Sequence, residues 1–282
     1  MWEVKGDTYS KRVNLKSGDI RLVKVRIRKQ SKIRRIFVPD DESKSFYRGL
    51  MGYLDKIHLK AKLVDSAHGF ISGKSAISNA EAHIGYDVTI SMDLLNFFES
   101  ITPRHVERYL PSKLIDVCFV EGILPQGVPT SPVISNIACV ELDKSITDLL
   151  AKYQASKIIT KFSFTRYADD ISVSFKFAEP CEIDSAICPF SDANRISSKY
   201  MKVFCSNIIR DVEKILKSYD FYLNNKTKLQ FASNGRRVIT GVSVGEFDIK
   251  ATRRIKKKLR AAIHKSNVNS VLGLVNWISQ QG

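Results

Sequence analysis

The sequence predicts an α+β fold in which antiparallel hairpins pack against amphipathic helices. Residues 23–38 and 162–175 each combine two apolar strand patterns with a short polar break, so each is expected to form a hairpin. Apolar residues recur with helical spacing over residues 43–63, 130–150 and 196–219. A chain of 282 residues with 44% apolar side chains is long enough to bury the cores of about two domains.

The first hairpin carries a row of cations. Along its first strand, apolar and basic residues alternate in the order Val23, Lys24, Val25, Arg26, Ile27 and Arg28. This period of two predicts a half-buried strand with one cationic face, and residues 33–38, closed by Pro39, are its expected partner. A helix is expected over residues 43–63, and the glycine-punctuated segment 68–75 is expected to be a loop.

Carboxylates gather at the ends of the central strands. Residues 88–94 alternate so that Asp93 points away from the apolar side of a strand, and Asp169 and Asp170 lie at the tip of the second hairpin. Adjacent carboxylates between apolar strands repel each other and are costly to desolvate, so this pair requires a cation. Two Mg²⁺ ions about 3.5–4 Å apart can activate a hydroxyl group and stabilise a leaving pyrophosphate. Taken alone, an Asp-Asp pair is more often a polar turn.

The net charge of +16 is concentrated near the two ends of the chain. Residues 1–38 hold twelve Lys or Arg against three Asp or Glu, and residues 246–265 hold eight against two, which gives +9 and +6. The other 224 residues carry 25 basic and 24 acidic side chains. This distribution indicates a polyanionic partner, with nucleic acid favoured over an anionic membrane surface.

A basic helix is expected over residues 250–264, after a strand at 238–244 and before a last helix at 271–278. Its cationic face backs onto Ile255, Leu259 and Ile263. Such a face suits the phosphate backbone of nucleic acid, with little reading of base sequence, and the alternative is a solvated charged helix. The candidate contact residues are Arg253, Arg254, Lys256, Lys257 and Arg260.

Cysteines and apolar runs restrict the class of protein further. The five cysteines include no Cys-x-x-Cys pair, so neither a disulfide framework nor a zinc site is expected. The charged N-terminal residues differ from a signal peptide, and no apolar stretch approaches about 18 residues. A cytoplasmic protein that does not span a membrane is expected.

The acid pair belongs to a series of motifs that resembles the reverse transcriptases. Tyr167-Ala168-Asp169-Asp170 resembles their Tyr-x-Asp-Asp signature, and Asp93 followed by Phe98 resembles their first metal-binding aspartate and its aromatic. Three further segments match in the order of the family. They are Arg34 to Pro39 (a fingers motif), Leu124 to Asn136 (the Pro-Gln-Gly loop and helix) and Leu223 to Thr227 (a motif whose lysine lies near the pyrophosphate).

Within that family the chain resembles the retron reverse transcriptases of bacteria. Asn79-Ala-Glu-Ala-His83 resembles their Asn-Ala-x-x-His element, and Ile239-Thr-Gly241 resembles their Val-Thr-Gly with Ile in place of Val. The length of the chain leads us to expect neither the maturase and endonuclease regions of a group II intron enzyme nor an RNase H domain. An abortive-infection or other group II intron-like bacterial enzyme with a different priming mode remains the alternative.

The resemblance implies a right-hand polymerase made of fingers, a palm with an antiparallel sheet, and a thumb. The expected boundaries are residues 1–86 for the fingers, 87–245 for the palm, with a fingers insertion near 104–128, and 246–282 for the thumb. Asp93 and Asp169 would hold two Mg²⁺ ions with Asp170 more peripheral.

The resemblance also assigns residues to the nucleotide. Lys226 would act on the leaving pyrophosphate or else be an ordinary surface charge. Phe98 would exclude a 2′-hydroxyl group unless it is an ordinary core aromatic. Arg34 and Lys32 would hold the triphosphate or else the template backbone. Gln126 and Gly127 would contact the nucleotide, with a plain turn as the alternative, whereas Asn79 and His83 form either a structural clasp or an RNA contact.

The implied activity is RNA-directed DNA synthesis from deoxynucleoside triphosphates (dNTPs). A retron enzyme copies part of a cognate structured non-coding RNA into a branched RNA–DNA molecule, msDNA, primed from a 2′-hydroxyl group. The implied setting is anti-phage defence, with a retron effector protein as a further partner and no membrane. The alternatives from other classes are a non-enzymatic RNA-binding scaffold and a protein-primed or untemplated polymerase.

Overall fold

The computed structural model describes residues 3–12, 19–29, 32–178, 191–192, 195–196 and 198–281. The chain forms two compact units, each built from several segments. Unit 1 comprises Met1–Asp65, Leu95–Lys144 and Tyr219–Phe221, and unit 2 comprises Ser66–Leu94, Ser145–Ser218 and Tyr222–Gly282. Helices and antiparallel sheets occur in both, which confirms the predicted α+β class.

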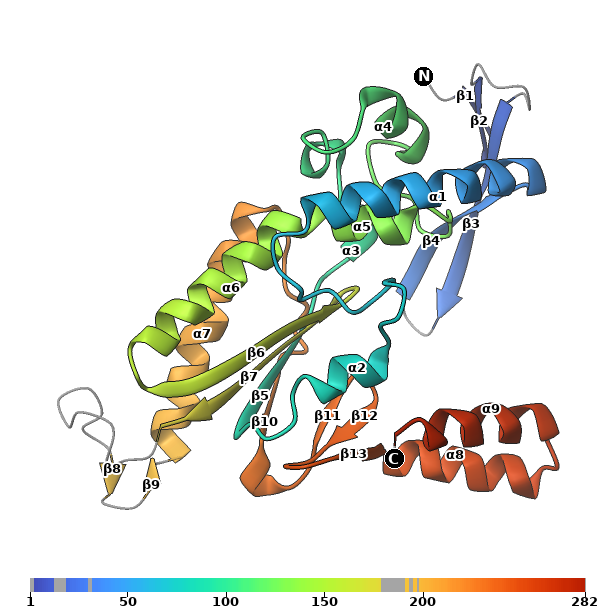
Figure 1. Ribbon diagram of the computed structural model, residues 1–282. Coiled ribbons are helices and arrows are strands. Elements are labelled where there is room, and N and C mark those ends of the chain that lie inside the picture. Colours follow the sequence, from blue (N-terminus) through green and yellow to red (C-terminus); the bar gives the residue numbers. More distant parts are fainter. Residues whose placement is uncertain are drawn as a thin grey trace. The chain divides into compact units, whose positions relative to one another are not determined.

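Unit 1 combines a four-stranded antiparallel sheet with a group of helices (Figure 1). Helix α1 lies along α5, and the fully buried Tyr47 of α1 donates a hydrogen bond from its hydroxyl group to the carbonyl oxygen of Val117 (2.8 Å). Asp40 caps α1 by accepting from the backbone N–H of Ser43 (2.8 Å), as expected for an N-cap aspartate. The strands are β1 (Glu3–Lys5), β2 (Thr8–Arg12), β3 (Asp19–Lys29) and β4 (Lys32–Pro39), and the helices are α1 (Asp41–Ala61), α3 (Phe97–Ser100), η1 (Pro103–His105), α4 (Ser112–Cys118) and α5 (Ser131–Ala138).

The predicted hairpin of β3 and β4 is confirmed, with Val25 paired to Ile36, but its sidedness is the reverse of the expected one. Val23, Val25 and Ile27 are 45%, 37% and 46% exposed. On the opposite face, Leu22 is buried and Lys24 is half-buried, with its side chain bound to Glu121 (3.0 Å) and Tyr9 (3.0 Å), whereas Arg26 is exposed. Alternation therefore predicted the strand correctly, whereas the side that is buried depends on partners distant in sequence.

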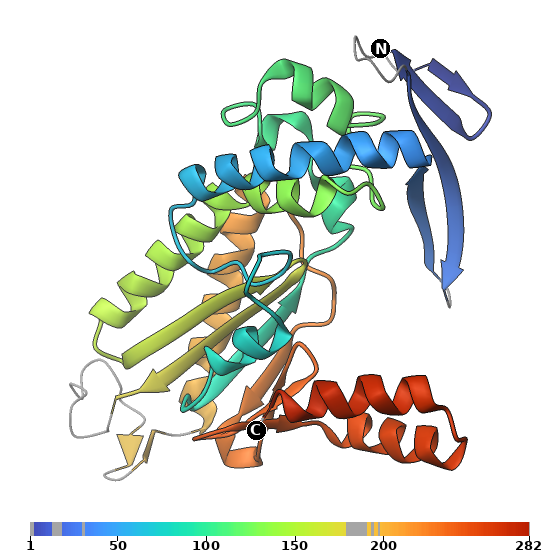
Figure 2. The ribbon, with the colours of Figure 1, turned by 45° about the vertical axis from the view of Figure 1, so that its right-hand side comes forward.

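Unit 2 is built on a four-stranded antiparallel sheet in the order β10-β5-β7-β6 (Figures 1 and 2). Phe204 of the long helix α7 packs edge-on against Phe175 and Phe177 of this sheet. The strands are β5 (Val88–Asp93), β6 (Ile159–Tyr167), β7 (Asp170–Phe177) and β10 (Lys228–Phe231). The helices are α2 (Ala76–Glu81), α6 (Val140–Ala155), whose first residues belong to unit 1, and α7 (Ser198–Ser218).

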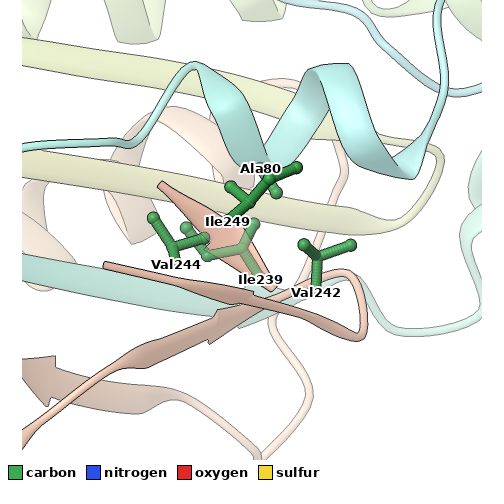
Figure 3. Packing of buried hydrophobic residues seen from close by; sticks show 5 residues of the cluster. All are labelled: Ala80, Ile239, Val242, Val244 and Ile249. Atoms are coloured by element: carbon green, nitrogen blue, oxygen red, sulfur yellow. The ribbon is translucent and has the colours of Figure 1, made fainter. Parts of the chain in front are cut away.

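A second small sheet of unit 2 packs against α2 (Figure 3). Its strands are β11 (Arg237–Ile239), β12 (Val242–Val244) and β13 (Ile249–Ala251). The single strand predicted over residues 238–244 is thus a tight hairpin, because Thr240 (φ 45°) and Gly241 (φ 83°) form a left-handed turn. The chain continues into α8 (Arg253–His264) and α9 (Val268–Ser279), which lie side by side (Figure 2).

The remaining expectations from the sequence also have structural outcomes. The helix predicted over residues 130–150 is two helices, α5 and α6, which meet at Cys139. Cys118, Cys139 and Cys205 are buried free thiols, while Cys181, Cys188 and the turn at residues 30–31 lie outside the described residues. The strands β8 (Ser191–Asp192) and β9 (Arg195–Ile196) form a short hairpin before α7. Among the described helices, none has the length and apolar character needed to cross a membrane.

Candidate active site

Two adjacent strands of unit 2 bring the three predicted aspartates to one end of the sheet. Asp93, the last residue of β5, is directly opposite Asp170, the first residue of β7. Asp169 lies in the preceding turn, and its carbonyl oxygen accepts a hydrogen bond from the backbone N–H of Leu94 (2.9 Å). The turn is tight because Ala168 adopts a left-handed conformation (φ 56°). Asp93 and Asp170, which are 77 positions apart in sequence, thus become neighbours through strand register.

The charges of these aspartates interact. Asp170 is solvent-accessible, yet the protein packed around its carboxyl group and the negative charges of Asp169 and Asp93 raise its pKa to about 6. Oxygen donors that repel one another in this way suit a hard divalent cation. Within the described ranges, no three His, Cys, Asp or Glu side chains converge as a formed metal cluster. The three carboxylates are therefore suited to a cation, because they are oxygen donors and because the register of β5 and β7 groups them at one end of the sheet.

Replacing Asp170 by asparagine is expected to stabilise the metal-free protein at neutral pH. A raised carboxyl pKa gives stability that is complete below the ordinary pKa of 3.8 and is lost as pH rises through about 6. In EDTA, Asp170→Asn should therefore raise the Tm by a few degrees at about pH 7.5, with a difference that shrinks toward about pH 4.5. Thermal unfolding at several pH values measures this, with Asp55→Asn on the exposed side of α1 as the control. A difference independent of pH would contradict the assignment.

Asn224 is a site residue that the sequence analysis did not single out. Its side-chain amide donates to Oδ2 of Asp93 (2.9 Å), and its backbone N–H donates to the carbonyl oxygen of Asp93 (2.7 Å). Both bonds fix the direction of the Asp93 carboxylate at the strand end. Asn224 lies in the quoted segment from Leu223 to Thr227, in which Lys226 alone was assigned a role.

Lys226 and Lys228 follow Asn224 on the way into β10. The backbone N–H of Lys226 donates to the carbonyl oxygen of Asn224 (2.6 Å), which places the lysine one tight turn beyond the Asp93 contact. Lys228 is paired with Ser91 of β5, and its positive charge lowers the pKa of Asp170, against the stronger effects that raise it. Lys228 is therefore a second cation of this site that the motifs did not indicate.

The residues predicted to contact the nucleotide all belong to unit 1. The backbone N–H of Phe37 in β4 donates to the carbonyl oxygen of Gln126 (2.8 Å). A Cβ atom on Gly127 (φ 104°) would lie 2.7 Å from both Ile36 Cγ2 and the carbonyl oxygen of Phe37. The packing of this loop against β4 therefore requires a glycine at this position.

The other predicted contacts of unit 1 differ in exposure. Phe98 is half-buried and meets the buried Phe97 edge-on, with ring centroids 5.4 Å apart, so Phe97 is the core aromatic of the pair. Arg34 is exposed, whereas its neighbour Arg35 forms a two-point pair with Glu99 (2.9 and 3.2 Å). Lys32 belongs to β4, and its side chain lies outside the described residues.

Asn79 and His83 are buried, at 1% and 0% exposure, which favours the structural clasp over an RNA contact. The Asn79 amide donates to Thr240 Oγ1 (3.3 Å), joining α2 to the turn between β11 and β12. The His83 ring bonds Ser174 (2.8 Å) and Thr165 (2.7 Å) on β7 and β6. Burial, assisted by nearby positive charge, lowers the His83 pKa to about 3, so the ring is neutral at physiological pH.

The predicted cations of α8 are all exposed. Arg253, Arg254, Lys257 and Lys258 line a shallow depression on its surface. Of the expected apolar stripe, Ile255 and Leu259 are half-buried, whereas Ile263 is 57% exposed. The helix therefore presents a broad cationic surface, as the sequence pattern predicts, over a narrow apolar contact.

Comparison with known proteins identifies the family. The model of the family described as "Reverse transcriptase (RNA-dependent DNA polymerase)" matches residues 27–257. The chain belongs to this family. Curated relatives include the retron Mx162 reverse transcriptase of Myxococcus xanthus (28% identity, 82% of this chain and 49% of that one) and the retron Ec86 reverse transcriptase of Escherichia coli (26%, 88% and 72%). The resemblance to retron enzymes is confirmed, and the chain spans about half the length of the Mx162 enzyme.

Solved structures support the predicted fold. The chain is similar to a Candida albicans telomerase in complex with a fragment of telomeric RNA (TM-score 0.53, 16% identity, 82% of this chain and 45% of that one). It is also similar to a truncated apo telomerase of Candida tropicalis (TM-score 0.51, 14% identity, 81% and 54%). At such identities the likeness concerns the fold alone, and it confirms the right-hand polymerase class.

Proposed function

We propose that the chain is an RNA-directed DNA polymerase of the retron type. The observation that carries the proposal is the register of β5 and β7, which places Asp93 opposite Asp170, with Asp169 in the adjoining turn. The family match and the retron relatives supply the reaction class. The substrates would be dNTPs and an RNA template, and the products a DNA strand and pyrophosphate.

Each side chain of the site has a distinct task in this proposal. Asp93 and Asp169 would hold two divalent ions, expected to be Mg²⁺, with Asp170 more peripheral. When bound, such ions lower the pKa of an attacking hydroxyl group and stabilise charge on the leaving pyrophosphate. Asn224 keeps the Asp93 carboxylate in place, and Lys226 would neutralise the pyrophosphate as it departs. Arg34, Gln126 and Gly127 would contact the incoming triphosphate, as would Lys32.

Phe98 would set the choice between deoxynucleotides and ribonucleotides. Phe98 is half-buried, so part of the residue remains accessible to solvent. Phe98→Ala is expected to reduce the ratio of kcat/KM for dNTPs over ribonucleotides by about 10–100-fold, the range for lost packing in a pocket. Single-nucleotide incorporation measures the ratio, with the half-buried Phe46→Ala of α1 as the control. An unchanged ratio would return Phe98 to a purely structural role.

The exposed cations of α8 would bind the backbone of the template–primer duplex. Each phosphate contact releases counterions, so Lys256→Ala and Lys257→Ala should each reduce the slope of log K against log salt by about 1. Fluorescence anisotropy with an RNA–DNA duplex at several salt concentrations measures the slope, and Lys152→Ala on the exposed side of α6 is the matched control. Equal slopes for all three variants would place the duplex elsewhere.

The finer parts of the proposal concern the region boundaries and the biological template. We propose fingers, palm and thumb regions at residues 1–86, 87–245 and 246–282, with a fingers insertion near 104–128 in the palm. The template would be a cognate structured non-coding RNA, copied into branched msDNA from a 2′-hydroxyl group. Anti-phage defence together with an effector protein is the proposed setting, and retron-type relatives support it by analogy.

Sequencing the nucleic acid that copurifies with the chain tests the retron assignment. We expect one defined RNA joined covalently to DNA that is complementary to part of it. DNA attached to protein, or DNA of random sequence, would instead indicate the protein-primed or untemplated polymerase. RNA without DNA, together with no primer extension in vitro, would indicate a non-enzymatic scaffold.

A further inference from the structure

The turn that carries Asp169 and Asp170 is backed by a segment far away in sequence, residues 66–69. The backbone N–H of Arg166 donates to the carbonyl oxygen of Ser66 (2.8 Å), and the N–H of His68 donates to that of Arg166 (2.8 Å). Ala67 and Arg166 form a parallel β-bridge. The segment therefore runs beside the end of β6 and reaches the turn.

Two side-chain contacts hold this segment in place. His68 Nδ1 lies 3.0 Å from Ser78 Oγ of α2, and Lys74 Nζ donates to the carbonyl oxygen of Ala67 (3.0 Å). His68 and Gly69 are buried. The segment is thus a fixed support and not a mobile loop end, because both its backbone and its side chains are bonded to neighbouring elements.

Gly69 contacts the turn so closely that no side chain fits between them. A Cβ atom on Gly69 would lie 2.6 Å from the backbone nitrogen of Ala168, closer than real Cβ contacts, and 3.1 Å from the carbonyl carbon of Tyr167, which is also tight. Gly69 does not belong to the glycines with positive φ, so an alanine could adopt its backbone conformation. The glycine is required here for space and not for conformation.

Arg166 supports the turn from inside the protein. Its side chain is fully buried, and Nη1 donates to the carbonyl oxygen of Ala168 (3.4 Å). Ala168 is the left-handed residue of the turn, with Asp169 next in the chain. The residue on which the turn depends is therefore contacted on its nitrogen side by Gly69 and on its oxygen side by Arg166.

We propose that Gly69 and Arg166 are positioning residues that hold Ala168 from behind and thereby direct Asp169 and Asp170 toward Asp93. This inference rests on the proposed polymerase function for its catalytic consequence. It requires no contact of either residue with substrate. Substitution of a residue that orients the ligands of a metal typically reduces activity or metal affinity by about 10–100-fold.

Gly69→Ala is the sharpest test, and Gly49→Ala is its matched control because no atom lies within 4 Å of a Cβ atom on Gly49. In primer extension we expect Gly69→Ala to reduce kcat by about 10–100-fold, with KM for dNTP and Kd for the duplex within about twofold of the wild type. Binding of Mn²⁺ to the protein alone, followed by electron paramagnetic resonance, should weaken about tenfold. Gly49→Ala should change none of these.

Arg166 provides a second, independent variant. Arg166→Lys keeps a donor and should retain more of the kcat and of the Mn²⁺ affinity than Arg166→Met, at similar Tm. The proposal would be overturned if Gly69→Ala bound Mn²⁺ and extended primers like the wild type. It would also be overturned if the losses in Gly69→Ala and Arg166→Met were explained by a lower Tm alone. If the wild type fails to extend primers while Mn²⁺ binding still responds to Gly69→Ala, the polymerase function fails and the positioning role stands.

Discussion

Asp169→Asn is expected to reduce primer extension by at least about 10³-fold while leaving duplex binding unchanged. An amide in place of this carboxylate removes a charge from the group that would hold both ions, and such ions supply several kcal/mol of transition-state stabilisation, about tenfold in rate per 1.4 kcal/mol. Asp93→Asn should have an effect of similar size, since Asp93 and Asp169 are the two residues that would hold the ions. Single-turnover extension of an RNA-templated primer, together with duplex Kd, measures both quantities.

The effect of Asp170→Asn provides an internal comparison. Asp170 is the more peripheral ligand in the proposal, so its substitution should reduce the rate less than that of Asp169 or Asp93. The pKa of about 6 belongs to the metal-free carboxyl group, so binding of Mg²⁺ should strengthen as pH rises through this value and Asp170 ionises. Extension that survives Asp169→Asn combined with Asp170→Asn would show that the active site lies elsewhere.

Local patterns predicted the strands and helices that carry these residues. The alternation of residues 88–94 and the apolar flanks of residues 162–175 are short-range signals, and both survive in β5, β6 and β7. The motif order then grouped Asp93 with Asp169 and Asp170. The register of the antiparallel sheet brings Asp93 and Asp170 together, because facing residues of paired strands are neighbours.

The missed features share one physical cause, namely contacts between residues distant in sequence. Asn224 bonds Asp93 across 131 positions, and the close approach of Gly69 to Ala168 leaves no local signature. The buried face of β3 was likewise decided by Glu121, which pairs with Lys24 across 97 positions. Alternation with a period of two predicts a strand. Which face of that strand is buried depends on the residues that pack against it.

Arg237 illustrates the same limit and is the basis of the largest stability prediction. Its side chain is 1% exposed and donates to Thr89 Oγ1 (3.1 Å) and to the carbonyl oxygens of His83 (2.9 Å) and Gly245 (3.2 Å). Burial lowers the pKa of this guanidinium, with Asp87 opposing the shift. The side chain thus links β11 to the central sheet and to the loop after β12.

Arg237→Leu is therefore expected to destabilise the protein by about 2–4 kcal/mol, because three acceptors lose their hydrogen-bond donor. The removal of a buried charge offsets part of this loss of stability. Chemical denaturation measures the change, and Arg236→Leu on the more exposed neighbour is the matched control. A double-mutant cycle with His83→Leu should be non-additive by about 0.5–3 kcal/mol. The coupling arises because Thr89 Oγ1 lies 2.7 Å from Ser174 Oγ, which in turn bonds the His83 ring (2.8 Å). Additive losses would mean that Arg237 and His83 stabilise the β10-β5-β7-β6 sheet independently of each other.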